Sequence, residues 1–104
     1  MVRRSFDRAT LTPLREMPSE DALALLAIYC KVDSTFQPVK QPTARRWHAR
    51  TSGGEFEILT TGPKWYDTRA KIGGGGAIDL AMHLLELSFV DAVRILIERE
   101  RHHG

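Results

Sequence analysis

Cysteine is almost absent from this 104-residue chain, because Cys30 is the only one. A single thiol excludes an internal disulfide, and it leaves the usual four-ligand zinc set of Cys and His without its sulfur ligands. The four histidines, His48, His83, His102 and His103, show none of the spacings typical of zinc ligands. We therefore expect no metal and no other cofactor, and we expect Cys30 to be a small apolar core residue.

Sequence frames typical of catalysis are also missing. No Ser/His/Asp set or carboxylate pair stands at a recognisable spacing, and the glycine run at residues 73–76 lacks the Lys-Ser/Thr pair of a nucleotide-binding P-loop. No stretch approaches the roughly 20 apolar residues of a membrane-spanning helix, and no segment resembles a signal peptide. The sequence predicts a cytoplasmic protein that is not an enzyme and has no membrane partner.

Charge is distributed unevenly along a chain whose net charge is only +2. Residues 31–76 carry eight basic and four acidic side chains, whereas residues 77–104 carry five acidic side chains and three arginines. A basic sheet beside more acidic helices would attract a polyanion to one face. The alternative is that this is the ordinary charged surface of a small domain.

The start of the chain predicts an arm. Residues 1–18 contain Pro13, Pro18 and scattered arginines without any periodicity, so we expect an N-terminal arm, either disordered or extended. The 42% hydrophobic content of so short a chain is enough for one modest core. We place the domain that holds this core at residues 19–104.

A helix is predicted next. Ser19 precedes Glu20 and Asp21, which suggests an N-cap followed by two acids near the positive end of the helix dipole. The helix should run to about Lys31 and include Cys30. Because it is apolar on nearly all sides, it should lie between the sheet and another element.

Alternating residues and turn signals in the middle of the chain predict an antiparallel meander. We expect a short edge strand at residues 34–37 and longer strands at residues 45–51, 55–61 and 64–67. The predicted fold class is α+β, with a small antiparallel sheet of three to five strands. One N-terminal and two C-terminal helices should pack on one face of that sheet.

Four consecutive glycines follow the last of these strands. Because glycine has no Cβ, we expect Gly73, Gly74, Gly75 and Gly76 to form a tight turn with φ > 0 at several positions. This turn would lead into a helix at residues 77–87, whose N-terminal N–H groups could bind an anion.

A last helix is predicted to begin at Ser88, which would act as its cap together with Asp91. Apolar residues recur at helical spacing along it. The buried stripe of this helix should consist of Phe89, Ala92, Val93, Leu96 and Ile97.

The segment WYDTRAKIGGGGAIDLAMHLLELSFVDAVRIL, residues 65–96, resembles the C-terminal half of the zinc-binding domain of bacterial DNA primases. It is most similar to the form found in primase-like proteins of plasmids and other mobile elements, where a glycine turn is followed by AID, MHL and SF. That family holds zinc through one His and three Cys. Here Trp65, Tyr66 and Asp67 stand where the later Cys pair would be, so the resemblance implies the fold of this domain without its metal.

Recognition of single-stranded DNA or of a primer-template is the function that this resemblance and the basic middle of the chain predict. Trp47 is expected to stack on bases and Trp65 to lie in the core. The expected nucleic-acid-binding residues are Arg45, Arg46, Trp47, His48, Lys64, Tyr66, Arg69 and Lys71.

The alternative function is a protein-interaction module that docks on a replication, conjugation or host-defence protein, such as a primase or a helicase. Solvent-facing aromatic residues among basic ones would favour DNA as the partner. An apolar patch on the helices would favour a protein.

Overall fold

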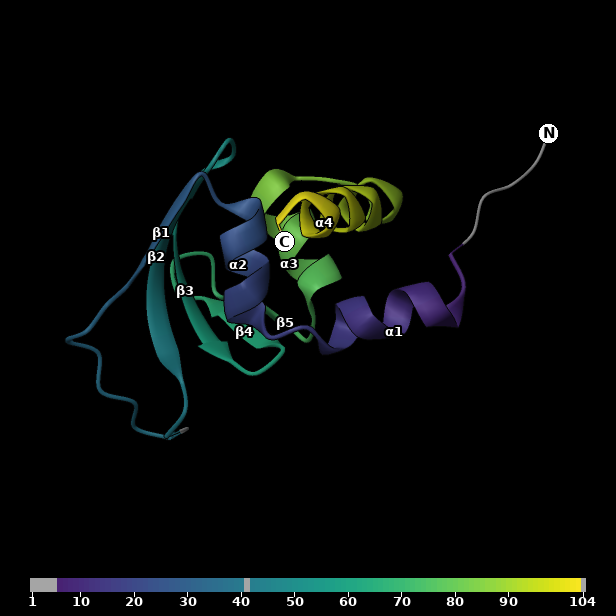
Figure 1. Ribbon diagram of the computed structural model, residues 1–104. Coiled ribbons are helices and arrows are strands. Elements are labelled where there is room, and N and C mark those ends of the chain that lie inside the picture. The colour runs from purple at the N-terminus through teal and green to yellow at the C-terminus, as the bar shows by residue number, and fades with distance from the viewer. Residues whose placement is uncertain (1–5, 41, 104) are drawn as a thin grey trace.

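A five-stranded antiparallel sheet with its helices on one side forms the protein in a computed structural model, which describes residues 6–40 and 42–103 (Figure 1). The elements in chain order are α1 (Arg8–Glu16), α2 (Ser19–Leu26), β1 (Tyr29–Val32), β2 (Arg45–Thr51), β3 (Gly54–Thr61), β4 (Lys64–Asp67), β5 (Ile72–Gly74), α3 (Ala77–Leu85) and α4 (Phe89–His103). This arrangement confirms the predicted α+β class. None of the helices in these residues has the length and hydropathy needed to cross a lipid bilayer.

The strands lie in the sheet in the order in which they occur in the chain, and each pairs antiparallel with the next. The longest pairing joins β2 to β3 and sets Trp47 opposite Ile58 and Ala49 opposite Phe56. The predicted strands at residues 45–51, 55–61 and 64–67 are confirmed, β3 beginning one residue early. Gly54, the first residue of β3, and Gly62, in the turn between β3 and β4, have φ values of 129° and 56°.

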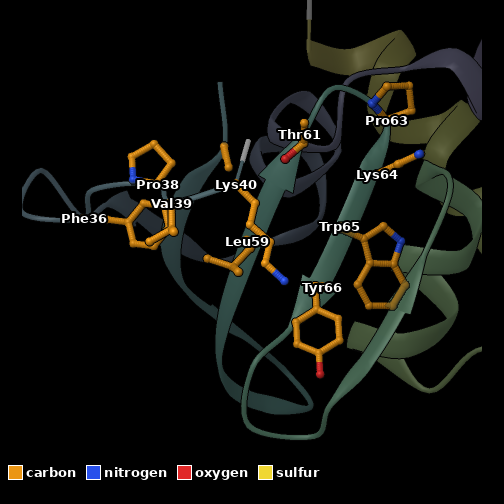
Figure 2. Close-up of a pocket in the computed structure, with 11 residues that line it drawn as sticks. Phe36, Pro38, Val39, Lys40, Leu59, Thr61, Pro63, Lys64, Trp65 and Tyr66 are labelled. Atoms are coloured by element: carbon orange, nitrogen blue, oxygen red, sulfur yellow. The ribbon is translucent and has the colours of Figure 1, made fainter. Parts of the chain in front are cut away.

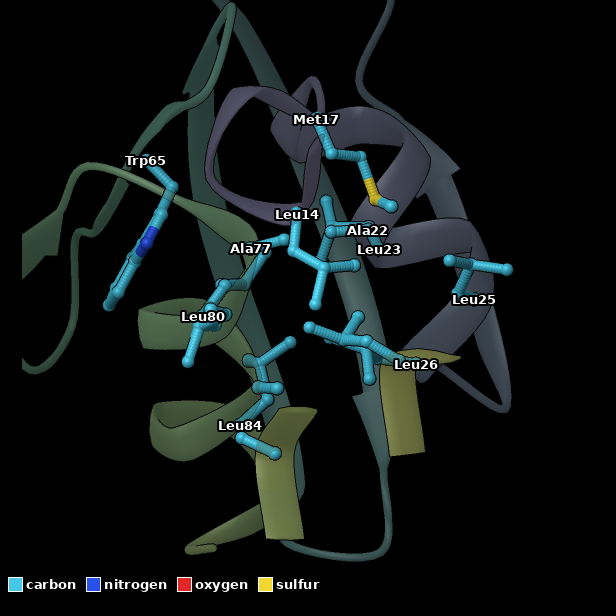
Figure 3. Close-up of a cluster of buried hydrophobic side chains, with 14 of the residues drawn as sticks. Leu14, Met17, Ala22, Leu23, Leu25, Leu26, Trp65, Ala77, Leu80 and Leu84 are labelled. Carbon is cyan, nitrogen blue, oxygen red and sulfur yellow. The ribbon is translucent and has the colours of Figure 1, made fainter. Parts of the chain in front are cut away.

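The core lies between the sheet and the helices, where Leu23, Leu26, Leu80 and Leu84 are almost completely buried (Figure 3). α2 contacts α3, α4, β1 and β3, which confirms that this apolar helix lies between the sheet and other elements. Strand residues that alternate with the core residues point to the opposite side.

Residues 8–16 form a helix, so the predicted arm is wrong for this part of the chain. Asp7 caps the helix, because its carboxylate accepts a hydrogen bond of 2.9 Å from the Thr10 amide. Leu14 is buried in the core together with Met17. Pro13 argues against a helix, because it removes one backbone hydrogen bond and crowds the carbonyl of Ala9, but α1 contains it all the same. Residues 1–5 lie outside the described residues.

α2 ends at Leu26 and not near Lys31, and Cys30 therefore lies in β1. Tyr29 and Val32 belong to residue types that favour strands. The end of α2 is held by Arg99, whose Nη1 donates to the carbonyl oxygen of Leu25 at 2.9 Å.

Two further predictions around α2 and β1 are wrong. Pro18 is the N-cap of α2, and the hydroxyl of the buried Ser19 donates instead to the carbonyl oxygens of Gly62 at 2.8 Å and Lys64 at 3.0 Å. These bonds tie α2 to the β3–β4 hairpin. Residues 34–37 form no strand; the chain turns there at Asp33 and continues as a loop.

The glycine run does not form the predicted turn. Gly73 and Gly74 belong to β5, and Gly76 precedes α3 with an extended φ of −165°. None of the four glycines has a positive φ; the left-handed residue in this region is Lys71, with a φ of 59°. Glycine at Gly73, Gly74 and Gly76 is therefore explained by atoms that a Cβ would contact too closely, and not by backbone conformation.

The two C-terminal helices are confirmed. α3 ends at Leu85, and the Ser88 hydroxyl accepts a hydrogen bond of 3.2 Å from the Asp91 amide. Ala92, Val93 and Leu96 are buried and Ile97 packs against the core. Phe89 departs from the predicted stripe, because it lies in the first turn of α4 and is 38% exposed.

Candidate nucleic-acid interface

The side of the sheet opposite the helices carries polar and aromatic side chains and is covered by none of the described helices (Figure 1). We call it the uncovered face. Its residues are Tyr29, Lys31, Arg46, His48, Arg50, Glu55, Glu57, Leu59, Thr61, Lys64 and Tyr66.

A groove of about 620 Å³ lies where the β1–β2 loop approaches β3 and β4 on this face (Figure 2). We call it the loop groove. Phe36, Pro38, Val39 and Lys40 line it from the loop, and Leu59, Lys64 and Tyr66 line it from the strands. Its volume lies within the range of small-molecule binding sites.

The loop groove combines an exposed aromatic ring with two cations. Tyr66 is 41% exposed, and its Cα neighbour on β3 is Leu59, which extends the apolar floor. Lys40 and Lys64 are exposed, and neither forms an ion pair with another described residue. An aromatic face beside lysines is a combination that proteins use to bind single-stranded nucleic acids.

The first half of the loop is held against β2 by Asp33. Its carboxylate accepts hydrogen bonds from Arg46 Nε at 2.9 Å and Nη2 at 2.5 Å, and from the Thr35 hydroxyl at 2.6 Å. The Thr35 hydroxyl, and then the Arg46 guanidinium, lower the pKa of Asp33 to about 2. The carboxylate is therefore ionised at neutral pH.

The structure brings four of the predicted binding residues to the uncovered face. Two of them line the loop groove, and the other two each contact a carboxylate. Lys64 and Tyr66 line the loop groove. Arg46 lies beside it and is paired with Asp33. His48 lies further along β2, where its Nε2 is 2.8 Å from a Glu55 carboxylate oxygen.

Arg45 and Trp47 point to the other side of the sheet. Arg45 is exposed at its border, 3.5 Å from the Glu20 carboxylate. Trp47 packs against the core, and its Nε1 donates to the Thr60 hydroxyl at 3.1 Å. The residue expected to stack on bases thus lies on the face that the helices cover, whereas the exposed aromatic ring of Tyr66 lies on the uncovered face. Trp65 is 5% exposed, which confirms its predicted place in the core.

Arg69 and Lys71 lie in the exposed turn between β4 and β5 and do not line the loop groove. The turn is organised by Asp67, whose Oδ1 accepts hydrogen bonds from the Arg69 and Ala70 amides at 2.9 and 3.0 Å. Any contact of these two cations with nucleic acid would extend beyond the groove.

Only Gly75 and Gly76 of the glycine run lie at the start of α3. Asp79 is in the first turn of that helix, and the Arg15 carbonyl oxygen would lie 3.2 Å from a Cβ on Gly76. Both groups place negative charge where an anion was expected. Anion binding at Gly73, Gly74, Gly75 and Gly76 stays a prediction.

Sequence reasoning missed the loop wall of the groove, formed by Phe36, Val39 and Lys40. The prolines around it argue against regular structure, but that pattern says nothing of the surface formed by the apolar residues between them. Val39 is 95% exposed. An aromatic and an aliphatic residue in an otherwise polar loop were the available signal.

A second polar cluster lies at the opposite side of β4. Asp67 Oδ2 is 2.7 Å from His83 Nε2, and the His83 ring stacks on Trp65 with 5.1 Å between centroids. Burial raises the pKa of Asp67, but hydrogen bonds from the Ala70 amide, His83 and the Arg69 amide lower it below its ordinary value. Within residues 6–40 and 42–103 no three His, Cys, Asp or Glu side chains gather as a metal site would require.

Comparison of the chain with models of protein families, with curated proteins and with solved structures found no match. The resemblance to the primase zinc-binding domain therefore stays a hypothesis. What the structure adds to it is a fold of the α+β class and a groove whose chemistry can be tested directly.

Proposed function

We propose that this protein is a non-catalytic module that binds single-stranded DNA, or the single-stranded part of a primer-template, in the loop groove. The observation that carries the proposal is the exposed ring of Tyr66 in a groove that Lys40 and Lys64 also line, on a face that the described helices leave uncovered (Figure 2). The resemblance to plasmid and mobile-element primases suggests a cytoplasmic role in replication or conjugation.

Single strands fit this geometry better than duplexes do. In a duplex the bases are stacked on one another, whereas an unpaired base can turn outward and lie on an aromatic ring. Tyr66 offers such a ring, and the ammonium groups of Lys40 and Lys64 can contact phosphates on either side of the base. Among the described residues, most of the large exposed apolar side chains lie on the sheet and its loops, and Phe89 alone is on a helix. The described helices thus offer little of the exposed apolar surface that would favour a protein partner.

Replacing Tyr66 with alanine should weaken the binding of single-stranded oligonucleotides by about 1 to 3 kcal/mol, because one stacked base is lost. Tyr29→Ala is the matched control. Tyr29 is also on the uncovered face and is 47% exposed, but it lies on β1 and does not line the groove. Fluorescence titration of labelled oligonucleotides measures both variants. Equal losses would show that stacking is not confined to the groove.

Replacing Lys64 with glutamine should weaken binding to all sequences and make the affinity less dependent on salt. Each lost phosphate contact lowers the slope of log affinity against log salt by about 0.7 for single strands. Tyr66→Ala should leave that slope unchanged, because no phosphate contact is removed. Titrations at several salt concentrations, with single- and double-stranded oligonucleotides, decide the matter. Absence of binding at low salt would remove the DNA hypothesis.

A second candidate is docking of a replication, conjugation or host-defence protein in the same groove. Val39, which is 95% exposed, and the apolar side chains of Phe36 and Leu59 favour it, since such surfaces also bind apolar segments of proteins. Failure of every oligonucleotide to bind, with the fold intact, would make this the better account.

A further inference from the structure

We infer that Asp33, Arg46 and Phe36 form a latch that holds the β1–β2 loop where it makes one wall of the loop groove. Arg46 would then serve binding as a positioning residue and not as a phosphate contact. The inference rests on the proposed function, because it assigns roles within the same groove.

The contacts of the latch converge on the guanidinium of Arg46. Its Nε and Nη2 atoms donate to Asp33 Oδ2, and its central carbon lies 5.1 Å from the centroid of the Phe36 ring. The Asp33 amide also donates to the Arg46 carbonyl oxygen at 2.8 Å, and the Phe36 amide donates to the Asp33 carbonyl oxygen at 3.2 Å. Two donors on one carboxylate oxygen and a cation over a ring fix the direction of the loop as it leaves β1.

The loop needs such fixing because of its length. It covers residues 33–44, whereas most hairpin loops have about 2 to 5 residues. Phe36, Pro38 and Val39 line the groove from this loop. If the latch opened, these side chains would leave the sheet and the apolar wall opposite Tyr66 would be lost.

A substitution of Asp33 tests the inference best, because its carboxylate and the phosphates of the proposed ligand are both negatively charged. A carboxylate beside a phosphate-binding groove repels DNA, so its removal should strengthen binding if only charge matters. The latch predicts the opposite result. If the loop without its latch occupied the binding position in about one molecule in ten, the apparent affinity would fall about tenfold.

The experiment compares four variants in the same salt titration. Asp33→Asn removes the charge that holds Arg46. Arg46→Lys keeps the positive charge but loses the planar guanidinium that bonds through two nitrogens and stacks on Phe36. Glu55→Gln removes another negative charge from the uncovered face, and Arg50→Lys makes the same exchange four residues along β2. Thermal melting confirms that each variant is folded.

We expect Asp33→Asn and Arg46→Lys to bind about tenfold more weakly with an unchanged salt slope. Glu55→Gln should bind equally or more tightly, and Arg50→Lys should match the unchanged protein. Tighter binding by Asp33→Asn, or an unchanged affinity of Arg46→Lys, would overturn the latch and leave DNA binding in place.

Limited proteolysis tests the latch even if no oligonucleotide binds. Trypsin should cleave after Lys40 faster in Asp33→Asn and Arg46→Lys than in the unchanged protein, because cleavage requires the loop to open. Cleavage after Arg101, in the last turn of α4, serves as the internal reference. Equal rates of cleavage after Lys40 in all variants would overturn the latch whatever the DNA titrations show.

Discussion

Replacement of Asp67 with alanine is expected to destabilise the protein by about 3 to 5 kcal/mol, because a buried carboxylate is lost together with three hydrogen-bond contacts. Asp67 is 2% exposed. Its carboxylate accepts hydrogen bonds from the amides of Arg69 and Ala70 and lies against His83 Nε2. Alanine would leave all three groups without their partner. At about 4 to 8 °C per kcal/mol for a domain of this size, the melting temperature should fall by more than about 10 °C.

The chain contains a matched control for this experiment in the exposed pair of His48 and Glu55. Its Nε2 to Oε1 distance of 2.8 Å is nearly the same as the 2.7 Å between His83 and Asp67. The side chains are 42% and 54% exposed, however, against 17% and 3% in the buried pair. Glu55→Ala should therefore change stability by less than about 1 kcal/mol. Equal effects of the two substitutions would contradict the role of burial.

Acid should reduce the contribution of Asp67 to stability. Its pKa is lower in the folded protein than its ordinary value of 3.8, so the stabilisation is present above that pH and is lost as the pH falls through the lowered value. The difference in unfolding free energy between the unchanged protein and Asp67→Ala should shrink as the pH falls below 3.8. Urea titrations at several pH values measure it.

The strands were predictable because alternation is a local property. In β2 and β3 the residues that face the helices alternate strictly with the others, and glycine marks the turns on both sides of β3. The helical spacing of Ala92, Val93 and Leu96 was equally local. These elements follow from neighbours in the sequence and need no knowledge of the rest of the fold.

The errors arose where a distant contact decides the structure. Ser19 has the sequence of an N-cap, but its hydroxyl bonds to the β3–β4 hairpin. Cys30 follows an apolar helix, but pairing with β2 draws it into a strand. Leu14 and Met17 attach α1 to the core, and they are buried only once the other helices are in position. Tertiary packing overrides local propensity at each of these positions.

In the candidate site, too, the residues set by local pattern were predictable and those set by distant contacts were not. Lys64 and Tyr66 were identified because β4 itself was predicted, and its alternation places both on one face. Trp47 was expected to stack on bases but packs against the core, because the sequence does not show which face of β2 the helices cover. The pairing of Asp33 with Arg46 joins the two ends of a loop, and no local pattern signals it.

Replacement of Gly74 with alanine is expected to destabilise the protein by about 3 kcal/mol, the upper end of the usual range for overpacking. A Cβ on Gly74 would lie 2.6 Å from Cζ2 and 2.7 Å from Nε1 of the Trp65 indole. The indole cannot easily yield, because it is buried, donates to the Gly76 carbonyl oxygen at 3.1 Å and stacks on His83. β5 would have to move away from β4 instead, and part of their hydrogen-bonded pairing would be lost.

Substitutions of two other glycines distinguish a close contact of the added Cβ from backbone strain as the cause of destabilisation. Nothing lies within 4 Å of a Cβ on Gly75, and its φ is not positive, so Gly75→Ala should change stability by no more than about 0.5 kcal/mol. A Cβ on Gly54 would also meet open space, but its φ of 129° is strained for alanine, and Gly54→Ala should destabilise by about 1 to 3 kcal/mol. Thermal and urea unfolding rank the three variants. If Gly74→Ala were as stable as Gly75→Ala, the contact with Trp65 would not be the reason for glycine in β5, and the run at residues 73–76 would act as a slack connection between β4 and α3.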